Sequence, residues 1–395
     1  MTKGRVGLLV ALFACALALR PQIVGIGPLL PGIQDDLDVS HAVAGLLGTI
    51  PVLCMGLFAP PAPYLLRWIG SRSALGASIA LIGAAGLARA VAPGAVPLVL
   101  LTFPVGVGIG LAGTLMPVAV KERFPHRPAL ATGIYTTGIN TGSAVSAAAA
   151  VPIAAAAGGW RTALLVFSGV TVALAALWLA QTRGRPAHER SSLRPPRLPL
   201  GSPVAWTLVA LFALLGTGFY GLNAWLPDSY VERGWSEESA GGLLAALNIA
   251  SIPGGLAIAW LADRRGSRRL YLGACAAVHV VALVGVIELP GGGWLWATLF
   301  GLANGGLFAL IMTLPLDVAD DAATVGAVAA LMLGAGYSIA ALSPFALGAV
   351  RDATGGYTTT LWVIVGTATA FLALSATLTR ERLRRGVPPD APAPV

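Results

Sequence analysis

The sequence predicts an all-α membrane protein with twelve transmembrane helices in two parallel six-helix halves. Three observations predict this fold class: the apolar composition, apolar segments of membrane-spanning length, and an internal repeat. Hydrophobic residues make up 56% of the 395-residue chain and charged residues 11%, and the mean hydropathy is +0.80. A soluble domain carries about 25% charged residues, so this composition indicates a membrane solvent.

Apolar segments that are long enough to cross a bilayer, at about 20 residues each, follow one another along the chain. Only helices satisfy the backbone of such segments in lipid without an open sheet edge. The expected spans run over 6–30, 43–66, 74–92, 97–120, 129–156, 162–182, 203–227, 238–262, 270–289, 293–316, 324–350 and 358–379.

The basic residues predict the orientation of these spans. If both termini are cytoplasmic, 20 of the 25 Lys and Arg residues fall in cytoplasmic loops or tails. The opposite side holds Arg89, Arg161, Arg233 and Arg351. The positive-inside rule therefore predicts cytoplasmic termini. The sequence pI near 9.9 does not indicate nucleic-acid binding, because the charges are spread over short loops rather than gathered on one face.

An internal repeat at an offset of about 196 residues relates the two halves. It is carried by four matched pairs: Leu30-Pro31 and Leu226-Pro227, Gly70-Ser71-Arg72 and Gly266-Ser267-Arg268, Pro117 and Pro315, and Gly158-Gly159-Trp160 and Gly355-Gly356-Tyr357. Because each half has an even number of spans, the halves are parallel. The expected domains are a six-helix bundle over 1–182, a basic, Pro-rich cytoplasmic linker over 183–202, a second bundle over 203–380 and a cytoplasmic tail over 381–395. Cleavage of the first span as a signal peptide is not expected, since it would remove part of the repeat.

Arg20 is the main candidate site residue, because it lies within the first span and that span has no acidic residue. A charge at the bilayer centre costs roughly 2.5–3.5 kcal/mol on insertion scales. Arg20 also lies roughly 20 Å from the start of the span, at 1.5 Å per residue, which is too deep for snorkelling. We expect it to be the positive pole of a substrate site. The alternative is a structural role in which it caps the carbonyls of a broken helix.

The loop after the eighth span carries a specific motif, Ala259-Trp260-Leu261-Ala262-Asp263-Arg264-Arg265-Gly266-Ser267-Arg268. It resembles the G-x-x-x-D-R-x-G-x-R loop of the major facilitator superfamily, with alanine in place of the first glycine. The resemblance implies that Asp263, Arg264, Gly266 and Arg268 form a conformational loop that stabilises one state. The first-half copy has Arg67 where the acid would stand, so we expect no such pair there.

Two further regions resemble a narrower family, the cyanate transporters and 2-nitroimidazole exporters (CynX/NimT). They are Leu19-Arg20-Pro21 with Gly27-Pro28-Leu29-Leu30-Pro31, and Phe219-Tyr220-Gly221 with Trp225-Leu226-Pro227. The superfamily lines its path with helices one, four, seven and ten, flanked by two, five, eight and eleven. The resemblance therefore implies that eight side chains converge on Arg20: Tyr135, Asn140, Tyr220, Asn223, Trp225, Asn248, Asn304 and Tyr337. The alternative is that these groups only join helices by hydrogen bonds, worth about 0.6 kcal/mol each.

Together these features predict a secondary transporter of the bacterial cytoplasmic (inner) membrane rather than an enzyme. The expected substrate is a small anion or a small polar organic compound, cyanate-like or carboxylate-like, moved by alternating access. The alternative is an exporter of neutral drug-like compounds such as nitro-aromatics, in which Arg20 is structural. We expect no cofactor, metal or nucleic-acid partner. The expected partners of this monomer are its substrate and membrane lipid, with a coupling proton or a counter-anion left open.

Several other patterns favour ordinary packing. Gly108-Ile109-Gly110-Leu111-Ala112-Gly113 matches a dinucleotide fingerprint but lies inside an apolar span, where no strand precedes it. It and the G-x-x-x-G pairs Gly106/Gly110, Gly138/Gly142 and Gly301/Gly305 predict close helix contacts. His279 is expected to pack or to face lipid, the spans are expected to carry no carboxylate at mid-depth, and Asp317 is expected in a solvated turn.

Overall fold

The computed structural model describes residues 3–59, 61–124, 128–183, 198–265, 268–318 and 322–378. Within these ranges every regular element is a helix. Eleven helical segments are long and apolar enough to cross a membrane, and one further apolar helix, α4 (His41–Leu57), is shorter. The predicted all-α membrane fold class is therefore confirmed.

The helices divide into two halves at the linker. The first half contains α1 (Lys3–Leu17), α2 (Pro21–Val24), η1 (Gly27–Leu29), α3 (Leu30–Leu37), α4, α5 (Ala62–Ala90), α6 (Ala95–Arg123), α7 (Pro128–Ala157) and α8 (Trp160–Gln181). The second half contains α9 (Pro203–Val231), α10 (Glu237–Arg265), α11 (Arg268–Glu288), η2 (Pro290–Gly292), α12 (Gly293–Thr313), α13 (Pro315–Val318), α14 (Ala322–Ala340), α15 (Leu342–Thr354) and α16 (Tyr357–Ala376).

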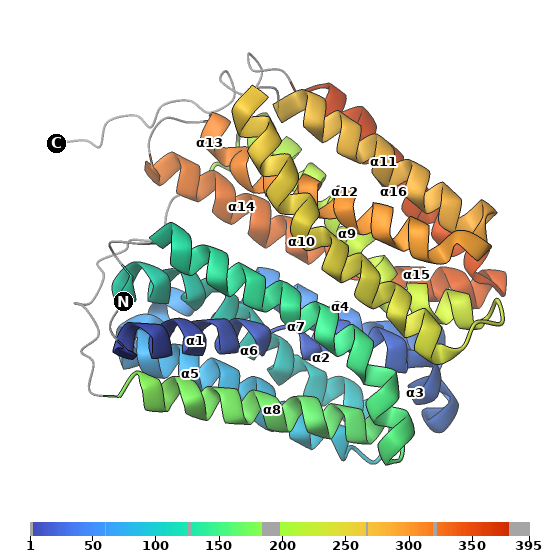
Figure 1. Cartoon of the computed structure of the whole chain (residues 1–395), viewed down its shortest axis with the longest axis horizontal. Coiled ribbons are helices and arrows are strands. Elements are labelled where there is room, and N and C mark those ends of the chain that lie inside the picture. Colours follow the sequence, from blue (N-terminus) through green and yellow to red (C-terminus); the bar gives the residue numbers. More distant parts are fainter. Residues whose placement is uncertain are drawn as a thin grey trace.

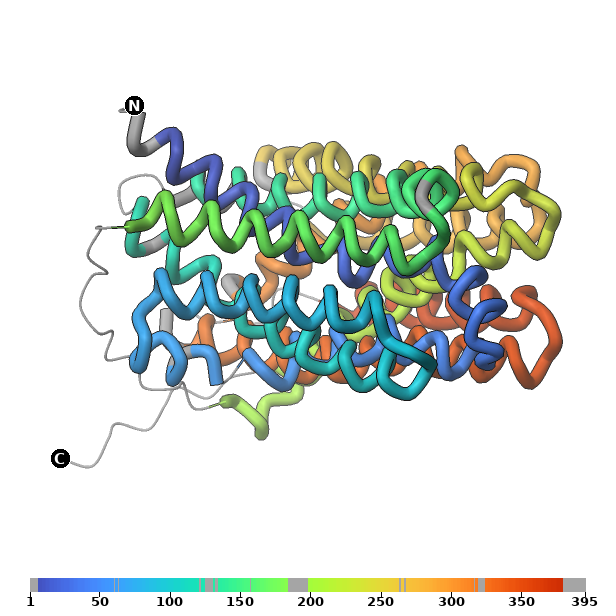
Figure 2. Tube along the Cα trace, turned by 90° about the horizontal axis from the view of Figure 1, so that it is seen from below, coloured from blue at the N-terminus to red at the C-terminus, as the bar shows by residue number. Residues whose placement is uncertain are grey.

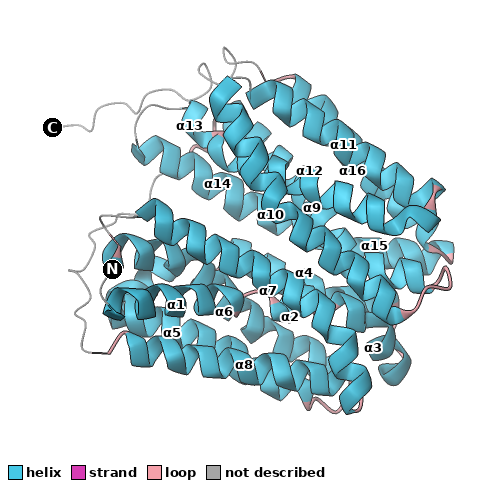
Figure 3. Ribbon diagram, viewed as in Figure 1, coloured by secondary structure: helices cyan, strands magenta, loops and turns pink. Residues whose placement is uncertain are grey.

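The two halves lie one above the other in Figure 1, with α1–α8 below and α9–α16 above. Figure 2 shows from a second side that the long helices run along one common axis. We call the end at which α1 begins the α1 end; α8 and α16 also end there. The opposite end, which carries α3 and the last turn of α15, is the α3 end (Figure 3).

The first expected span, 6–30, is not one helix. Helix α1 ends at Leu17, and α2, η1 and α3 follow as short, separate pieces. Pro21, Pro28 and Pro31 lack the backbone N–H that a continuous helix would need. Residues 21–30 are all buried, so the irregular backbone is shielded by protein, which is the condition under which it is tolerated in a membrane. The repeat-related helix α9 is continuous over 29 residues.

Two other spans also differ from expectation. The second, expected over 43–66, ends at Leu57, and the residues after Pro61 belong to α5, which is kinked at Gly70 with φ 74° and ψ 161°. A positive φ of this kind is readily adopted only by glycine. The eleventh, expected over 324–350, is divided into α14 and α15 at Ala341, two residues before Ser343-Pro344. Hydropathy placed these segments in the membrane but could not show where the helices break.

The predicted role of the G-x-x-x-G pairs is confirmed. A Cβ atom at Gly110 would overlap the Cys54 carbonyl oxygen of α4, and one at Gly142 would overlap the Leu17 carbonyl oxygen of α1. In the second half a Cβ atom at Gly305 would overlap the Ser251 carbonyl oxygen of α10. The absent side chains allow backbones of neighbouring helices to touch.

This packing gives a first prediction. Gly110→Leu should lower the melting temperature of the purified protein by several degrees, because overpacking a close contact costs about 1–3 kcal/mol. Gly113→Leu is the matched control, since a Cβ there meets nothing within 4 Å on the same helix. Equal melting temperatures for the two variants, measured by differential scanning fluorimetry, would contradict the packing role.

Candidate functional site

Arg20 lies at the break in the first helix, where it is the residue before α2. Its Nη1 donates a hydrogen bond to the hydroxyl oxygen of Tyr220 on α9 at 3.4 Å, and the guanidinium also interacts with the hydroxyl of Tyr337 on α14. Both tyrosines belong to the other half. In the part of the chain that the structure describes, no carboxylate pairs with Arg20. The structure thus places an unneutralised cation between the halves.

Aromatic rings surround this cation. Tyr220 and Tyr337 lie with ring centroids 6.4 Å apart, and Phe219 and Phe212 pack edge-on against them at 5.2 and 4.8 Å respectively. Arg20 is half-buried. A guanidinium has five N–H donors in a planar fork, and the contacts with the hydroxyls of Tyr220 and Tyr337 leave most of them available. Such a group suits bidentate recognition of a small planar or linear anion.

Three of the remaining predicted site residues have hydrogen-bond partners other than Arg20. Asn248 donates to the side-chain oxygen of Asn223 at 3.2 Å, and both amides also donate to carbonyls of their own helices. Trp225 is fully buried and donates to the Pro344 carbonyl at 2.8 Å. These bonds join helices, which is the alternative weighed from the sequence, and a binding role for the three residues stays a prediction.

Three further candidates lie on other helices. Tyr135 and Asn140 are partly exposed on α7, the helix whose Gly138 and Gly142 contact α1. Asn304 is buried on α12, and its side-chain oxygen has no hydrogen-bond partner. A role for these side chains in binding stays a prediction.

The conformational loop is described only in part. Asp263 ends up within α10, but its side chain and Gly266 lie outside the described residues. Arg264 stacks over the Trp260 ring at 4.1 Å. Arg268 pairs with Asp317 at 2.7 Å, so Asp317 is ion-paired rather than only solvated. This pair joins the start of α11 to α13, within the second half.

The halves are also joined at the α3 end, by a helix cap that the sequence did not predict. Asp352 of α15 accepts hydrogen bonds from the backbone N–H groups of His41 and Ala42, at 3.1 and 2.9 Å. It also contacts His41 Nδ1 at 2.8 Å. His41 and Ala42 begin α4, so a carboxylate of one half caps a helix of the other. A negative charge is favourable at this position because the unpaired N–H groups and the helix dipole both attract it.

His41 is in contact with a second carboxylate. Its Nε2 lies 3.6 Å from Asp228 of α9, and its ring packs against Trp225 and Tyr357. The Tyr357 hydroxyl donates to Asp228, and the nearby charges Arg351 and Glu232 pair with each other at 2.8 Å. Asp228 is only 8% exposed, so the α3 end holds a buried carboxylate that the sequence analysis did not single out. Its position one residue after the expected end of the seventh span hid it from the hydropathy pattern.

Arg89, which the sequence assigns to the side opposite the termini, is a second buried charge. The structure buries it completely at the end of α5. It donates to the side-chain oxygen of Gln22 at 2.5 Å. The apolar flank Ala88 and Ala90-Val91-Ala92 was the available signal. His279 is buried on α11 with its ring 4.1 Å from that of Phe300, which agrees with the packing role.

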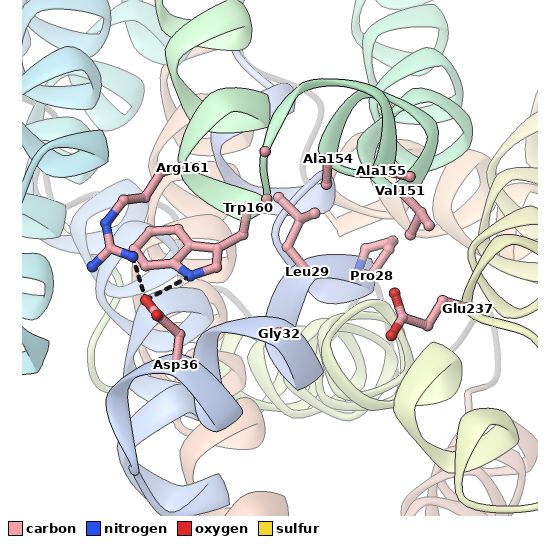
Figure 4. Close-up of a pocket in the computed structure, with 12 residues that line it drawn as sticks. Pro28, Leu29, Gly32, Asp36, Val151, Ala154, Ala155, Trp160, Arg161 and Glu237 are labelled. Atoms are coloured by element: carbon pink, nitrogen blue, oxygen red, sulfur yellow. Dashed lines mark hydrogen bonds and ion pairs between the residues drawn. The ribbon is translucent and has the colours of Figure 1, made fainter.

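A pocket of about 410 Å³ opens at the α3 end (Figure 4). It lies between α3, α7, α8 and α10. Its polar groups are acidic or already paired: Asp36 accepts hydrogen bonds from the Trp160 indole N–H and from Arg161, while Glu237 points toward the pocket from α10. Arg20 does not line it. The charges of this pocket do not suit an anion.

Comparison with known proteins gives consistent relatives. The family model of the Major Facilitator Superfamily matches residues 7–341. The cyanate transport protein CynX of Escherichia coli (strain K12) is 32% identical over 89% of this chain and 91% of CynX. The 2-nitroimidazole transporter of the same strain is 30% identical over 91% of this chain and 92% of that protein. A crystal structure of a bacterial homologue of the human lysosomal transporter Spinster shares the fold, with a TM-score of 0.73 at 16% identity, over 97% of this chain and 94% of that one.

The cap at the α3 end gives a second prediction. Asp352→Ala removes the acceptor of the His41 and Ala42 N–H groups, while the N-cap Ser40 keeps its bond to Val43. The loss should cost about 1 kcal/mol and change the ratio of joined to separated halves about fivefold. Spin labels on Ala156→Cys and Ala353→Cys, at exposed positions of the two halves, would report longer distances. The three native cysteines are buried.

Asp36→Ala is the matched control for this measurement. It removes an aspartate at the same end whose partners, Trp160 and Arg161, belong to its own half. The distance distribution should then stay as in the wild type. A distribution that is unchanged in Asp352→Ala would show that the cap does not hold the halves together.

Proposed function

Because the chain belongs to the Major Facilitator Superfamily, we propose that it is a secondary transporter that moves a small anion, or a small polar organic compound, by alternating access. The chain is a multi-pass membrane protein of a transporter family. The proposed substrate class is cyanate-like or carboxylate-like: a compact, electron-rich group that a guanidinium can bind.

The observation that carries this proposal is the environment of Arg20. A cation inside the membrane region is costly unless a partner neutralises it. Arg20 has phenol hydroxyls but no carboxylate near it in the described residues, so an anionic ligand would supply the missing charge. Cyanate, named in one relative, is a small monovalent anion. The neutral 2-nitroimidazole of another relative carries a nitro group, which presents two acceptor oxygens to the same planar fork.

The two-half architecture supports a mechanism. Arg20 belongs to the first half, and Tyr220 and Tyr337 belong to the second, so the proposed site lies where the halves meet. We place the basic α1 end in the cytoplasm, as the distribution of Lys and Arg indicates. The Asp352 cap then closes the outer end, and release of this cap would accompany opening to the outside. Ligand binding would replace the 3.4 Å contact between Arg20 and Tyr220 with charge-assisted hydrogen bonds to both halves.

Electrical work constrains the direction. A monovalent anion that enters a negative-inside cell works against about 2.3 kcal/mol per 100 mV. Uptake therefore requires a co-transported proton, entry as the neutral acid or exchange for another anion, whereas export is assisted by the potential.

A transport assay tests the role of Arg20 directly. Arg20→Lys should lose at least tenfold in the initial rate of cyanate flux into proteoliposomes, because an ammonium keeps the charge but not the planar fork of donors. The conservative control is Arg161→Lys, at an exposed ion pair far along the chain from the site. Near wild-type flux in Arg20→Lys, at equal reconstitution, would contradict the proposal.

Binding can be measured without transport. Cyanate, nitrate and formate should raise the melting temperature of the wild-type protein in a concentration-dependent way, since a ligand of the native state stabilises it by mass action. Arg20→Gln should abolish this shift. If only neutral nitro-aromatics stabilise both proteins, Arg20 is structural and export of neutral compounds is the better assignment.

A further inference from the structure

Gln22 is the single polar side chain of α2, the four-residue helix that follows Arg20. It is completely buried, and both ends of its amide are held. The side-chain oxygen accepts from Arg89 Nη2 of α5 at 2.5 Å, and the side-chain nitrogen donates to Ser168 of α8 at 2.9 Å. Arg89 also donates to Thr102 of α6 at 3.3 Å. We call these four residues the Gln22 cluster.

The burial of Arg89 is energetically unfavourable, although its guanidinium holds the Gln22 amide. It is 0% exposed, its Nε has no hydrogen-bond partner, and within the described residues it forms no ion pair. Its acceptors are neutral oxygens. A buried cation without a counter-charge destabilises the fold, so its presence calls for a benefit beyond helix packing.

The backbone connects this cluster to Arg20. The Arg20 carbonyl accepts hydrogen bonds from the N–H groups of Ile23 and Val24, at 3.0 and 2.9 Å, so Arg20 is built onto the first turn of α2. On its other side α1 has already ended at Leu17. Continuous helix therefore does not fix the direction of Arg20, and the anchoring of α2 must do so.

The repeat-related positions of the second half support a link between the Gln22 cluster and the broken helix. At the repeat offset of about 196 residues, Gly218 corresponds in sequence to Gln22, and Gly285 corresponds to Arg89. There the corresponding helix, α9, is unbroken. The cluster thus occurs in the half whose first helix is broken, and the half with an intact helix has neither side chain.

We propose that Arg89 is a positioning residue that, through Gln22, sets the place and direction of Arg20 at the substrate site. This proposal rests on the proposed anion-transport function. Arg89 binds no substrate itself; it holds α2 so that the Arg20 guanidinium meets its ligand in one geometry. Preorganisation of this kind raises affinity because less ordering is left for the binding step.

The first test compares cyanate affinity among variants. Arg89→Met keeps the apolar stem but removes the donors, and we expect the Kd for cyanate to rise about tenfold, as for loss of a hydrogen bond from a charged group. Ser168→Ala should raise it less. Arg89→Lys should recover part of the affinity, because an ammonium can still donate to the Gln22 oxygen.

Thr171→Val is the matched control. Thr171 is buried one turn after Ser168 on α8, and its hydroxyl donates only to the Phe167 carbonyl of the same helix. It lowers stability without touching α2, so the Kd should stay within about twofold of the wild type. An equal rise in Kd for Thr171→Val would overturn the proposal, because it would show general loosening of the first half.

A second readout does not depend on the substrate. Arg20→Cys provides a thiol at the site, and the native cysteines are buried, so its rate of reaction with a water-soluble maleimide reports the position of residue 20. Adding Arg89→Met or Ser168→Ala should change this rate several-fold, and adding Thr171→Val should not.

The two readouts separate the possible failures. Unchanged Kd and unchanged labelling rate in the Arg89→Met and Ser168→Ala proteins would overturn the positioning role. If the wild type binds no cyanate, the proposed anion function fails, and the labelling rates alone decide the positioning role. If Arg89→Met does not fold, Ser168→Ala carries both measurements.

Discussion

The structure depends on one constraint: a cation and a broken helix must both be accommodated inside a membrane protein. Neither is tolerated in contact with lipid, because lipid offers no partner for the charge or for the freed backbone groups. The charge of Arg20 and the freed backbone groups of the broken helix are accommodated at the same place in the structure. Arg20 occupies the break, residues 21–30 behind it are all buried, and the Gln22 cluster satisfies the polar side chain of α2 from α5 and α8. The surrounding helices of the first half are therefore arranged around α2 as well as around an apolar core.

The halves are related by a repeat but differ where it matters for function. In the first half the first helix is broken at Arg20, and in the second half the eleventh span is broken between α14 and α15. Their counterparts, α9 and α7, are continuous. Tyr220 of the unbroken α9 meets Arg20 at the first break, and Asp352 of α15 meets the start of α4. The first break thus faces an intact helix of the other half, whereas the Asp352 contact forms at the α3 end, eleven residues after the second break.

The polar contacts between the halves are of kinds that can break and form again. The described ones include a long hydrogen bond from a guanidinium to a phenol and a carboxylate that caps a helix at a partly exposed edge. Each contributes about 1 kcal/mol, and water or a ligand can replace the partner that is lost. Close contact of backbone with backbone at glycines occurs within each half, as in the G-x-x-x-G pairs, and also between the halves, where Gly27 meets Asn223 and Gly45 meets Pro344. A rocking motion between the halves would therefore have to separate both the polar contacts and these glycine contacts.

The sequence by itself determined the membrane fold, the repeat and the glycine contacts, and it singled out Arg20 as the main candidate site residue, because each of these follows from composition or spacing along one chain. Hydropathy averages over a window, so it could not show that α4 stops at Leu57 or that the first span is four pieces. Only the tertiary structure decided which polar groups are engaged in hydrogen bonds within the protein and which keep donors available. It paired Asn223 with Asn248, turned Trp225 to Pro344, and buried Arg89 and Asp228. The physical reason is that burial and hydrogen bonding belong to neighbours from distant parts of the chain: Arg89 and Gln22 are 67 residues apart, and their contact leaves no pattern in the sequence between them.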